Sequence, residues 1–210
     1  MGCDIHIYTE ARQSIKNIYK WVNIDNWRVN PYFREFDEAR EYKIKEIYGD
    51  RNYELFSFLA GVRNYAGNPS FGFDRGLPED ISPTTKKESD LWDCDGHTHG
   101  YCTLKELKEA ISKVKKIRRE GAVTKEAAER YRTTGETPNF WAQGVGCFQG
   151  IAPDYQDRYE WLVWTDEVNC FTRLIEAIEE RKRDFFWIRN KDEDDFTHDD
   201  DIRIVFWFDN

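Results

Sequence analysis

The sequence predicts an α+β fold in which both ends of the chain belong to one central sheet flanked by helices. Residues 3–9 alternate between apolar and polar side chains, which is the period of a β-strand. Residues 202–208 are apolar on both faces, which is typical of a central strand. Residues 103–119 place apolar side chains at helical spacing. Together these segments predict a mostly antiparallel or mixed sheet in a single domain, residues 1–210.

The composition of the chain limits what kind of protein it can be. Its 210 residues suffice for one domain, with room for a small appended lobe. Aromatic residues make up 16% of the chain and carry large apolar areas, so a core is expected although 34% of residues are charged. The net charge of −9 disfavours non-specific nucleic-acid binding, because that binding depends on Lys and Arg neutralising phosphates.

The cysteine content and the absence of long apolar runs point to the cytoplasm. Five sparse cysteines at irregular spacing are typical of a reducing compartment rather than of a disulfide framework. Asp4 and His6 interrupt the apolar run that a signal peptide would need. No apolar stretch approaches the roughly 20 residues of a membrane span. We therefore expect a cytoplasmic protein with no membrane partner.

The first half of the chain predicts strands, one short helix and a long loop. Residues 15–22 are rich in β-forming side chains and could pair with the first strand as a hairpin. Residues 51–60 predict a short buried helix, with Asp50 as its cap and Gly61 after it. Residues 64–102 are rich in Gly and Pro and predict a loop; a loop of this length in a compact domain is usually functional.

The second half predicts mainly helices. Thr103 and Glu106 form a capping box, which starts the helix over residues 103–119. Further helices are predicted at residues 125–132, 154–164 and 166–184. An acidic loop over residues 191–201 then leads into the closing strand.

Asp4 and His6 form the first of two polar clusters. They lie two residues apart on the predicted opening strand, so both side chains leave the same face. Imidazole titrates near neutrality and is a common metal ligand, and a neighbouring carboxylate can bind the same cation or orient the ring. The alternative is that the pair forms the solvated face of the strand. We predict that both residues are catalytic and bind a metal ion.

The second cluster is Asp95-x-His97-x-His99. If this segment is extended, its two imidazoles lie on one side of it and the aspartate can add a third ligand. The cluster precedes the helix that the capping box starts, and free N–H groups in a first turn attract anions. We predict that Asp95 and His97 are catalytic, and that Asp95, His97 and His99 complete a divalent metal site (Zn, Mn or Mg). The alternative is a solvated polar loop.

The cysteines allow two other interpretations. The spacing Cys94-x2-His97-x-His99-x2-Cys102 could form a structural zinc site, although so compact a loop would strain a tetrahedral arrangement. Cys94 or Cys3 could instead be a nucleophile that a histidine activates. Buried and inert cysteine is the commoner outcome.

Five segments of the chain resemble a family of bacteriophage and prophage proteins. They are the start Met-Gly-Cys-Asp-Ile-His and the segments 51–64, 75–82, 95–107 and 205–210. The resemblance spans most of the chain and implies a phage-encoded protein that acts in the host bacterial cytoplasm. Accessory phage proteins often counter host defence. The family pattern does not depend on cysteine at positions 94 and 102, which disfavours the cysteine–zinc interpretation.

Several positions shared with that family are polar, as expected for a binding or catalytic cleft. Arg51 and Arg75 could each grip a phosphate through two hydrogen bonds. Asn52 and Asn64 are predicted to bind substrate with them. Trp141, in an aromatic and glycine-rich segment, could stack on a base.

Two functional hypotheses follow. The leading one is a metal-dependent hydrolase, such as a phosphodiesterase, that acts on a small phosphorylated or nucleotide-like substrate. The competing one is a non-catalytic protein that sequesters a host signalling nucleotide or blocks a host defence protein; assembly into a homo-oligomer would favour it. The metal-dependent hypothesis requires the opening strand and the histidines of the second cluster to converge on one cavity.

Overall fold

The computed structural model divides the chain into two compact units. One unit comprises Met1–Lys113 and Cys170–Asn210, and the other comprises Val114–Asn169. The structure describes residues 2–15, 18–34, 40–139, 146–147, 150–189 and 198–209. The predicted α+β class is confirmed, with an antiparallel central sheet and flanking helices.

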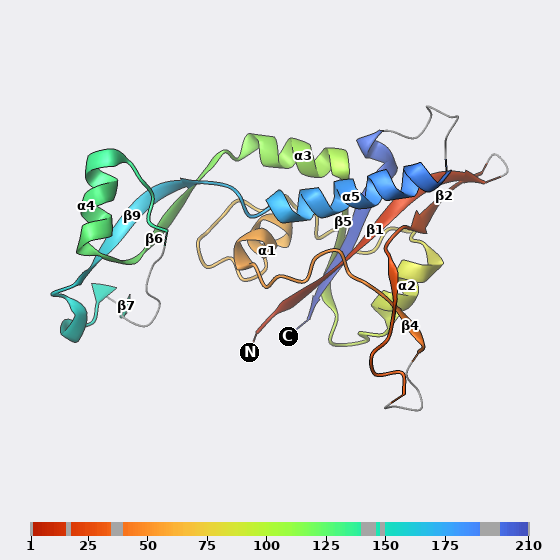
Figure 1. Cartoon of the computed structure of the whole chain (residues 1–210), viewed down its shortest axis with the longest axis horizontal. Coiled ribbons are helices and arrows are strands. Elements are labelled where there is room, and N and C mark those ends of the chain that lie inside the picture. The colour runs from red at the N-terminus through yellow and green to blue at the C-terminus, as the bar shows by residue number, and fades with distance from the viewer. Residues whose placement is uncertain are drawn as a thin grey trace. The chain divides into compact units, whose positions relative to one another are not determined.

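The first unit is built on a four-stranded antiparallel sheet in the order β2-β1-β10-β5. The strands are β1 (Asp4–Ile15), β2 (Ile18–Asn23), β10 (Ile202–Asp209) and β5 (His97–Thr103). The predicted hairpin of the first two strands is present, and the last strand is central as predicted. Asp4 pairs with Asp209, so the first strand begins beside the end of the last (Figure 1).

Both faces of β1 are buried along its first half. Ile5 and Ile7 lie in the core on one face, as the alternation predicts. On the other face His6 and Tyr8 are only 8% and 3% exposed. The alternative that His6 belongs to a solvated strand face is therefore wrong. Only Asp4, whose side chain is 47% exposed, fits that description.

Helix α1 (Tyr53–Ala60) closely matches the predicted short helix. Asn52, and not Asp50, is its N-cap: the side-chain oxygen accepts hydrogen bonds from two backbone N–H groups of the first turn. Gly61 ends the helix at a φ of 70°, a left-handed conformation that glycine adopts without strain. Apolar side chains occupy more than one face of this helix, and it is buried over most of its length.

Residues 64–102 are not the continuous loop that the sequence predicts. They contain helix α2 (Pro83–Asp90) and most of β5. Ser82 caps α2 by accepting a hydrogen bond from the backbone N–H of Thr85 at 3.2 Å. The proline that follows the cap occupies the first turn, where a missing N–H costs no hydrogen bond.

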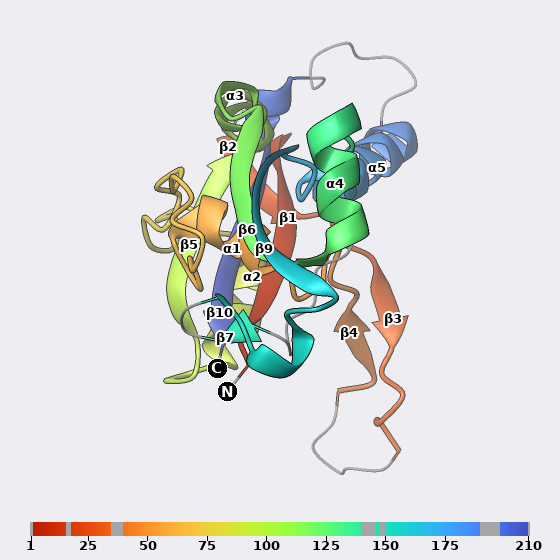
Figure 2. The same ribbon diagram turned by 90° about the vertical axis from the view of Figure 1, so that its left-hand side faces the viewer.

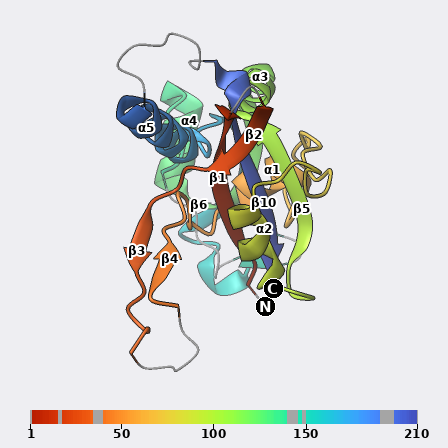
Figure 3. The same ribbon diagram turned by 90° about the vertical axis from the view of Figure 1, so that its right-hand side faces the viewer.

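A two-stranded ribbon lies beside the sheet, formed by β3 (Trp27–Val29) and β4 (Tyr42–Ile44) (Figure 3). Arg28 pairs with Lys43, and cross-strand partners share a face, so these two cations lie together. Ile44 lies on the opposite face and is buried against Tyr8 and Trp207 of the sheet. This contact anchors the ribbon to the core.

Three more elements complete the first unit: α3 (Leu104–Lys113), α5 (Thr172–Arg189) and the short 3-10 helix η3 (Asp199–Asp201). The predicted capping box is confirmed. The Glu106 N–H donates to Thr103 Oγ1 at 3.1 Å, and the Thr103 N–H donates to Glu106 Oε2 at 2.8 Å. Helix α5 starts later than the helix predicted over residues 166–184.

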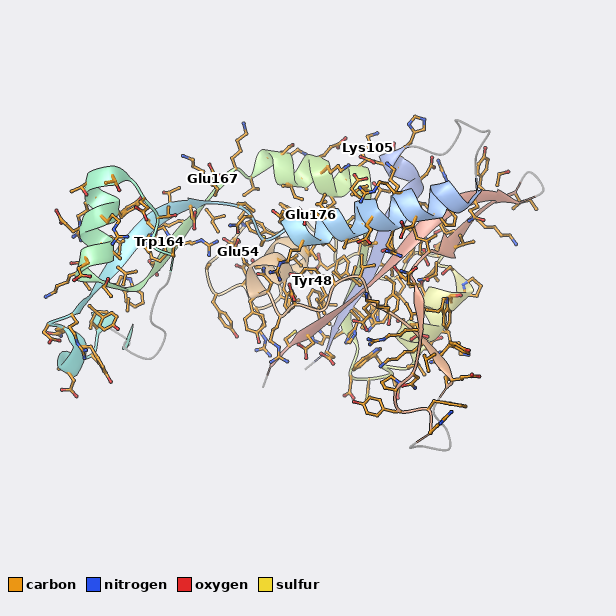
Figure 4. The ribbon with its side chains drawn as sticks, in the orientation of Figure 1. Tyr48, Glu54, Lys105, Trp164, Glu167 and Glu176 are labelled. Atoms are coloured by element: carbon orange, nitrogen blue, oxygen red, sulfur yellow. The ribbon has the colours of Figure 1, made fainter. Side chains whose placement is uncertain are left out.

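The second unit is a long antiparallel ribbon of β6 (Lys116–Thr124) and β9 (Tyr159–Glu167) covered by α4 (Lys125–Thr134) (Figure 2). Trp164 packs with Ala128 between ribbon and helix (Figure 4). The unit also contains β7 (Gly146–Cys147), β8 (Gly150–Ile151) and the 3-10 helix η1 (Pro153–Tyr155).

The helix predicted over residues 154–164 is wrong, as is the extension of the capping-box helix to residue 119. Both segments lie largely in the β6–β9 ribbon. Along β9, buried Leu162 and Trp164 alternate with exposed neighbours, which is the period of a strand. The helix predicted at residues 125–132 is confirmed as α4. Within the described part of the chain, no helix combines the length and apolarity required to cross a bilayer.

Candidate functional site

His6 lies at the centre of a largely buried polar cluster. Its Nδ1 is 3.1 Å from Oε1 of Glu46, and its Nε2 faces Oδ2 of Asp209 at 3.5 Å. The second contact lacks the geometry of a hydrogen bond, but it is close enough for the two charges to attract. The ring of Trp92 lies against the imidazole, with 4.0 Å between ring centroids. Each ring nitrogen of His6 therefore faces a carboxylate, which favours the imidazolium form.

The pKa of His6 reflects this balance. Burial disfavours the charged ring, but the hydrogen bond with Glu46 and the negative charges of Glu46 and Asp209 outweigh it, so the pKa of His6 is raised. Burial and the nearby carboxylates also raise the pKa of Tyr8. Tyr8 therefore keeps its proton at neutral pH, and its hydroxyl donates to Oε1 of Glu46 at 3.5 Å.

A cavity of about 530 Å³ lies beside this cluster. Its volume falls within the range of small-molecule sites. Tyr8, Glu46 and Trp92 line it from the side of the sheet. Arg28 and Lys43 line it from the paired face of the β3–β4 ribbon, and Lys45, which directly follows that ribbon, also contributes. The cavity thus combines an aromatic wall with a cationic one.

The carboxylates of this cavity already have cationic partners. Glu46 faces His6, and Glu88 accepts a hydrogen bond from Arg40 at 2.8 Å. By contrast, Arg28 and Lys43 form no ion pair with any residue that the structure describes, and the same holds for Lys45. The local charge therefore favours an anionic ligand, although the chain as a whole is acidic.

Asp4 and Arg51 are brought together at the edge of the His6 cluster, where the backbone N–H of Asp4 donates to Oδ1 of Asp209 at 3.1 Å. The guanidinium donates two hydrogen bonds to the carboxylate, Nε to Oδ1 and Nη2 to Oδ2, each at 2.7 Å. The hydrogen bond with Arg51 lowers the pKa of Asp4. Arg51 thus occupies the carboxylate that was predicted to bind a metal ion, and Asp4 occupies the guanidinium that was predicted to bind a phosphate.

The two histidines of the second cluster lie on opposite faces of the sheet. Thr98, between them, has a φ of 50°, and the pairing of β5 with β10 shifts at this point. His97 stacks on Phe208 and His99 stacks on Trp207, at centroid distances of 6.1 and 5.9 Å. Consecutive strand residues such as Trp207 and Phe208 point to opposite faces. The prediction that the two imidazoles share one side is therefore wrong.

His99, and not His97, shares a face with His6. Both rings stack on Trp207, each at 5.9 Å. Burial and the positive charges of His97 and Lys86 lower the pKa of His99, so its ring is neutral at pH 7. Asp95 is exposed in the turn before β5.

The predicted metal ligands do not form one cluster among the residues with described positions. No group of three or more His, Cys, Asp or Glu side chains there is arranged to hold a metal ion. The divalent ion assigned from the sequence stays a prediction, which metal analysis of protein purified without a histidine tag would test. Cys3 and Cys102 are buried, and burial raises the pKa of both thiols, which is the reverse of what a nucleophilic thiolate needs.

The remaining residues predicted to bind substrate mostly support local structure. Asn52 caps α1, and Asn64 holds its own loop through two hydrogen bonds with the backbone of Asn68. Arg75 donates to both carboxylate oxygens of Glu106, at 3.0 and 2.7 Å. Trp141 lies outside the described residues.

A second buried charge lies farther along the same face of the sheet. Arg203 donates from Nε to Oε2 of Glu10 at 2.8 Å and from Nη1 to Oδ1 of Asp80 at 2.6 Å. Its guanidinium lies 4.1 Å from the ring centroid of Trp21, and Glu10 also accepts the backbone N–H of Ser82. This network satisfies its own members, so we regard it as structural.

Comparisons with protein-family models, curated proteins and solved structures found no match to this chain. The function is therefore proposed from the geometry of the site. Sequence reasoning singled out His6 but missed Glu46, Trp92 and the two ribbon cations, Arg28 and Lys43. The tryptophan lies three residues before the second polar cluster, and the Lys-Ile-Lys alternation over residues 43–45 could have indicated a strand with one cationic face.

Proposed function

We propose that the protein binds a small phosphorylated, nucleotide-like molecule in the cavity beside His6 and does not convert it chemically. The observation that carries this proposal is that cationic and aromatic side chains line one cavity. Arg28 and Lys43 form a paired cationic face that can contact one phosphate group. Trp92, which is half-buried, supplies aromatic surface on which a base can stack.

The state of the titratable groups favours binding over turnover. A general acid or base must come within hydrogen-bond reach of the substrate. His6 is largely buried, and both of its ring nitrogens face carboxylates. Tyr8 keeps its proton because its pKa is raised by burial. Metal-dependent hydrolysis stays a prediction from the sequence, and the experiment below separates it from simple binding.

The resemblance to phage proteins gives this proposal a biological setting. A phage-encoded protein that binds a signalling nucleotide without destroying it would lower the free concentration of that nucleotide in the host cytoplasm. Such sequestration is one way to counter a defence system that the nucleotide activates. Expression of the protein in a bacterium with such a system, followed by phage challenge, would test this part.

Calorimetric titration with a panel of mono-, di- and cyclic nucleotides tests the binding. The double variant Arg28→Ala, Lys43→Ala is expected to weaken binding by about tenfold for each cation that no longer reaches the phosphate. The control variant Lys20→Ala, Lys113→Ala makes the same change in net charge at two exposed positions of the same unit that do not line the cavity, and it should leave the affinity unchanged.

The fate of the ligand distinguishes a binding protein from an enzyme. After incubation the protein is denatured, and the released ligand is analysed by anion-exchange chromatography. Intact ligand agrees with the proposal, whereas a hydrolysed ligand would identify an enzyme and refute the non-catalytic part. If no member of the panel binds, the cavity is not a nucleotide site.

A further inference from the structure

We infer that the bound ring presents two adjacent N–H donors along one edge, as guanine does and adenine does not, and that Glu46 recognises them. This inference rests on the proposed function and specifies the ligand class of the same cavity. It starts from the hydrogen bonds that the Glu46 carboxylate makes with its neighbours.

Only one of the two carboxylate oxygens of Glu46 has partners among the described residues. Oε1 is approached by the ring Nδ1 of His6 and by the hydroxyl of Tyr8. An ionised carboxylate offers about four lone-pair positions, two on each oxygen. The two neighbours account for those on Oε1, which leaves two positions on Oε2. The Glu46 side chain is 32% exposed and the residue lines the cavity, and we place Oε2 on the side that a ligand reaches.

The chemical character of Glu46 follows from those neighbours. The Tyr8 hydroxyl donates to Oε1 of Glu46, and Nδ1 of His6 lies 3.1 Å from the same oxygen, so both neighbours present a donor to Glu46. A carboxylate that receives two hydrogen bonds on one oxygen acts purely as an acceptor on the other. It therefore pairs with N–H groups and repels the lone pair of a ring nitrogen.

The arrangement of the cavity orients a nucleotide. Trp92 and Glu46 both line the cavity and both contact the buried His6: the ring of Trp92 lies against the imidazole, and the Glu46 carboxylate faces its Nδ1. A base stacked on Trp92 would have one edge beside Glu46. Lys43 and Lys45 alternate with the buried Ile44 and so lie toward the outside. The base would point inward and its phosphate outward.

Guanine fits this arrangement because its N1–H and exocyclic amino group are neighbouring donors. Adenine presents one amino group beside a ring nitrogen that carries a lone pair, which would face Oε2 directly. A binding site built to hydrogen-bond a ligand strongly rejects an analogue that leaves its buried polar groups unpaired. We therefore expect discrimination between the two bases from a single residue.

Calorimetric titration of the wild-type protein with GMP, IMP and AMP tests the inference. GMP should bind tightest, IMP, which keeps N1–H but lacks the amino group, should be intermediate, and AMP should be weakest. Each missing charge-assisted hydrogen bond is expected to cost roughly 10- to 100-fold in affinity. This comparison needs no variant, so it does not depend on how well a mutant folds.

Two variants test whether Glu46 is the residue that causes the preference for GMP over AMP. Glu46→Gln replaces the acceptor-only group by an amide that both donates and accepts, and it should reduce the ratio of GMP to AMP affinity by at least about tenfold. Lys43→Ala should weaken both ligands alike and leave that ratio unchanged. Circular dichroism checks that each variant is folded.

The outcomes separate this inference from the proposed function. Equal binding of GMP and AMP, or a preference for AMP, would show that Glu46 does not recognise guanine. The cavity would still be a nucleotide site. Binding of other phosphorylated ligands but of neither GMP nor AMP would also overturn the inference. A Glu46→Gln variant that keeps the full guanine preference would show that another group recognises the base. If no phosphorylated ligand binds at all, the proposed function itself fails.

Discussion

Replacing Asp25 by asparagine is expected to remove a large part of the pH dependence of stability. Asp25 is 5% exposed and follows β2. Its Oδ2 accepts the backbone N–H of Thr9 at 2.8 Å and the side-chain amide of Asn23 at 2.9 Å. Burial raises its pKa to about 7, against the opposing effects of these two hydrogen bonds and of the positive charge of Arg181.

The sign of the effect follows from the two pKa values. The folded value of about 7 lies above the ordinary value of 3.8, so the native state holds this proton more tightly than the unfolded chain does. Stability is therefore highest below the lower value and falls as the pH rises through the higher one. The largest possible loss from this one group is about 4 kcal/mol.

Asparagine imitates the protonated carboxyl and does not titrate. Its oxygen can keep both hydrogen bonds that Oδ2 of Asp25 accepts. The variant should therefore match the wild type near pH 3, below both pKa values, should already be more stable by about 1.6 kcal/mol near pH 5, and near pH 8 should be more stable by up to about 4 kcal/mol. Urea unfolding at intervals between these pH values gives the difference in unfolding free energy. Other titrating groups are common to both proteins and cancel in that difference.

Asp74→Asn serves as the matched control, because Asp74 is exposed in the same unit. Its effect on stability should be small and should not change with pH over this range. The reasoning about Asp25 is refuted if the Asp25→Asn variant differs from the wild type by a constant amount at all pH values. It is also refuted if the variant is the less stable protein near pH 8.

Two further predictions concern the packing and the histidines of the sheet. Gly100→Ala should destabilise the protein by about 2 kcal/mol or more, because a Cβ there would lie 2.2 Å from the backbone oxygen of Phe73. Gly49→Ala, where a Cβ meets no atom within 4 Å, is its control, and similar urea midpoints for the two variants would contradict the expected clash. NMR titration should find the pKa of His6 above that of free histidine and the pKa of His99 below it. The reverse order would mean that the two carboxylates do not govern the His6 ring.

Local patterns in the sequence predicted the parts of the fold that local interactions determine. The alternation over residues 3–9 and the continuous apolarity of residues 202–208 identified the two central strands. The Thr103–Glu106 capping box identified the start of α3 because both of its hydrogen bonds lie within one turn. Such features need no knowledge of the rest of the chain.

The predicted secondary structure was wrong where pairing with a segment far along the chain decides the conformation. Residues 114–119 continue the apolar helical spacing of α3, yet residues 116–124 pair over nine positions with β9, about forty residues later. If the same residues formed a helix, the nine pairs with β9 could not form. Helix α2 was missed for another reason: its Ser82–Pro83 start is a recognisable signal, but the surrounding glycines and prolines predict a loop.

The candidate site was only half visible in the sequence for the same reason. His6 could be singled out by its residue type, but its partner Glu46 lies forty residues away along the chain. The step from His97 to His99 was misjudged because regular alternation was assumed. The left-handed conformation of Thr98 breaks that alternation, and a β-branched residue gives little warning of it.

The positions of the cavity cations follow from a hydrophobic contact. Ile44 is buried against Tyr8 and Trp207, which fixes how the β3–β4 ribbon meets the sheet. Side chains alternate along a strand, so anchoring Ile44 inward directs its neighbour Lys43 outward, and Arg28 follows because it is the cross-strand partner of Lys43. Tyr8 also takes part in both contacts, since it packs on Ile44 and donates to the carboxylate of the site. The same apolar anchor that stabilises the ribbon therefore brings its cations to the cavity that the aromatic side chains also line.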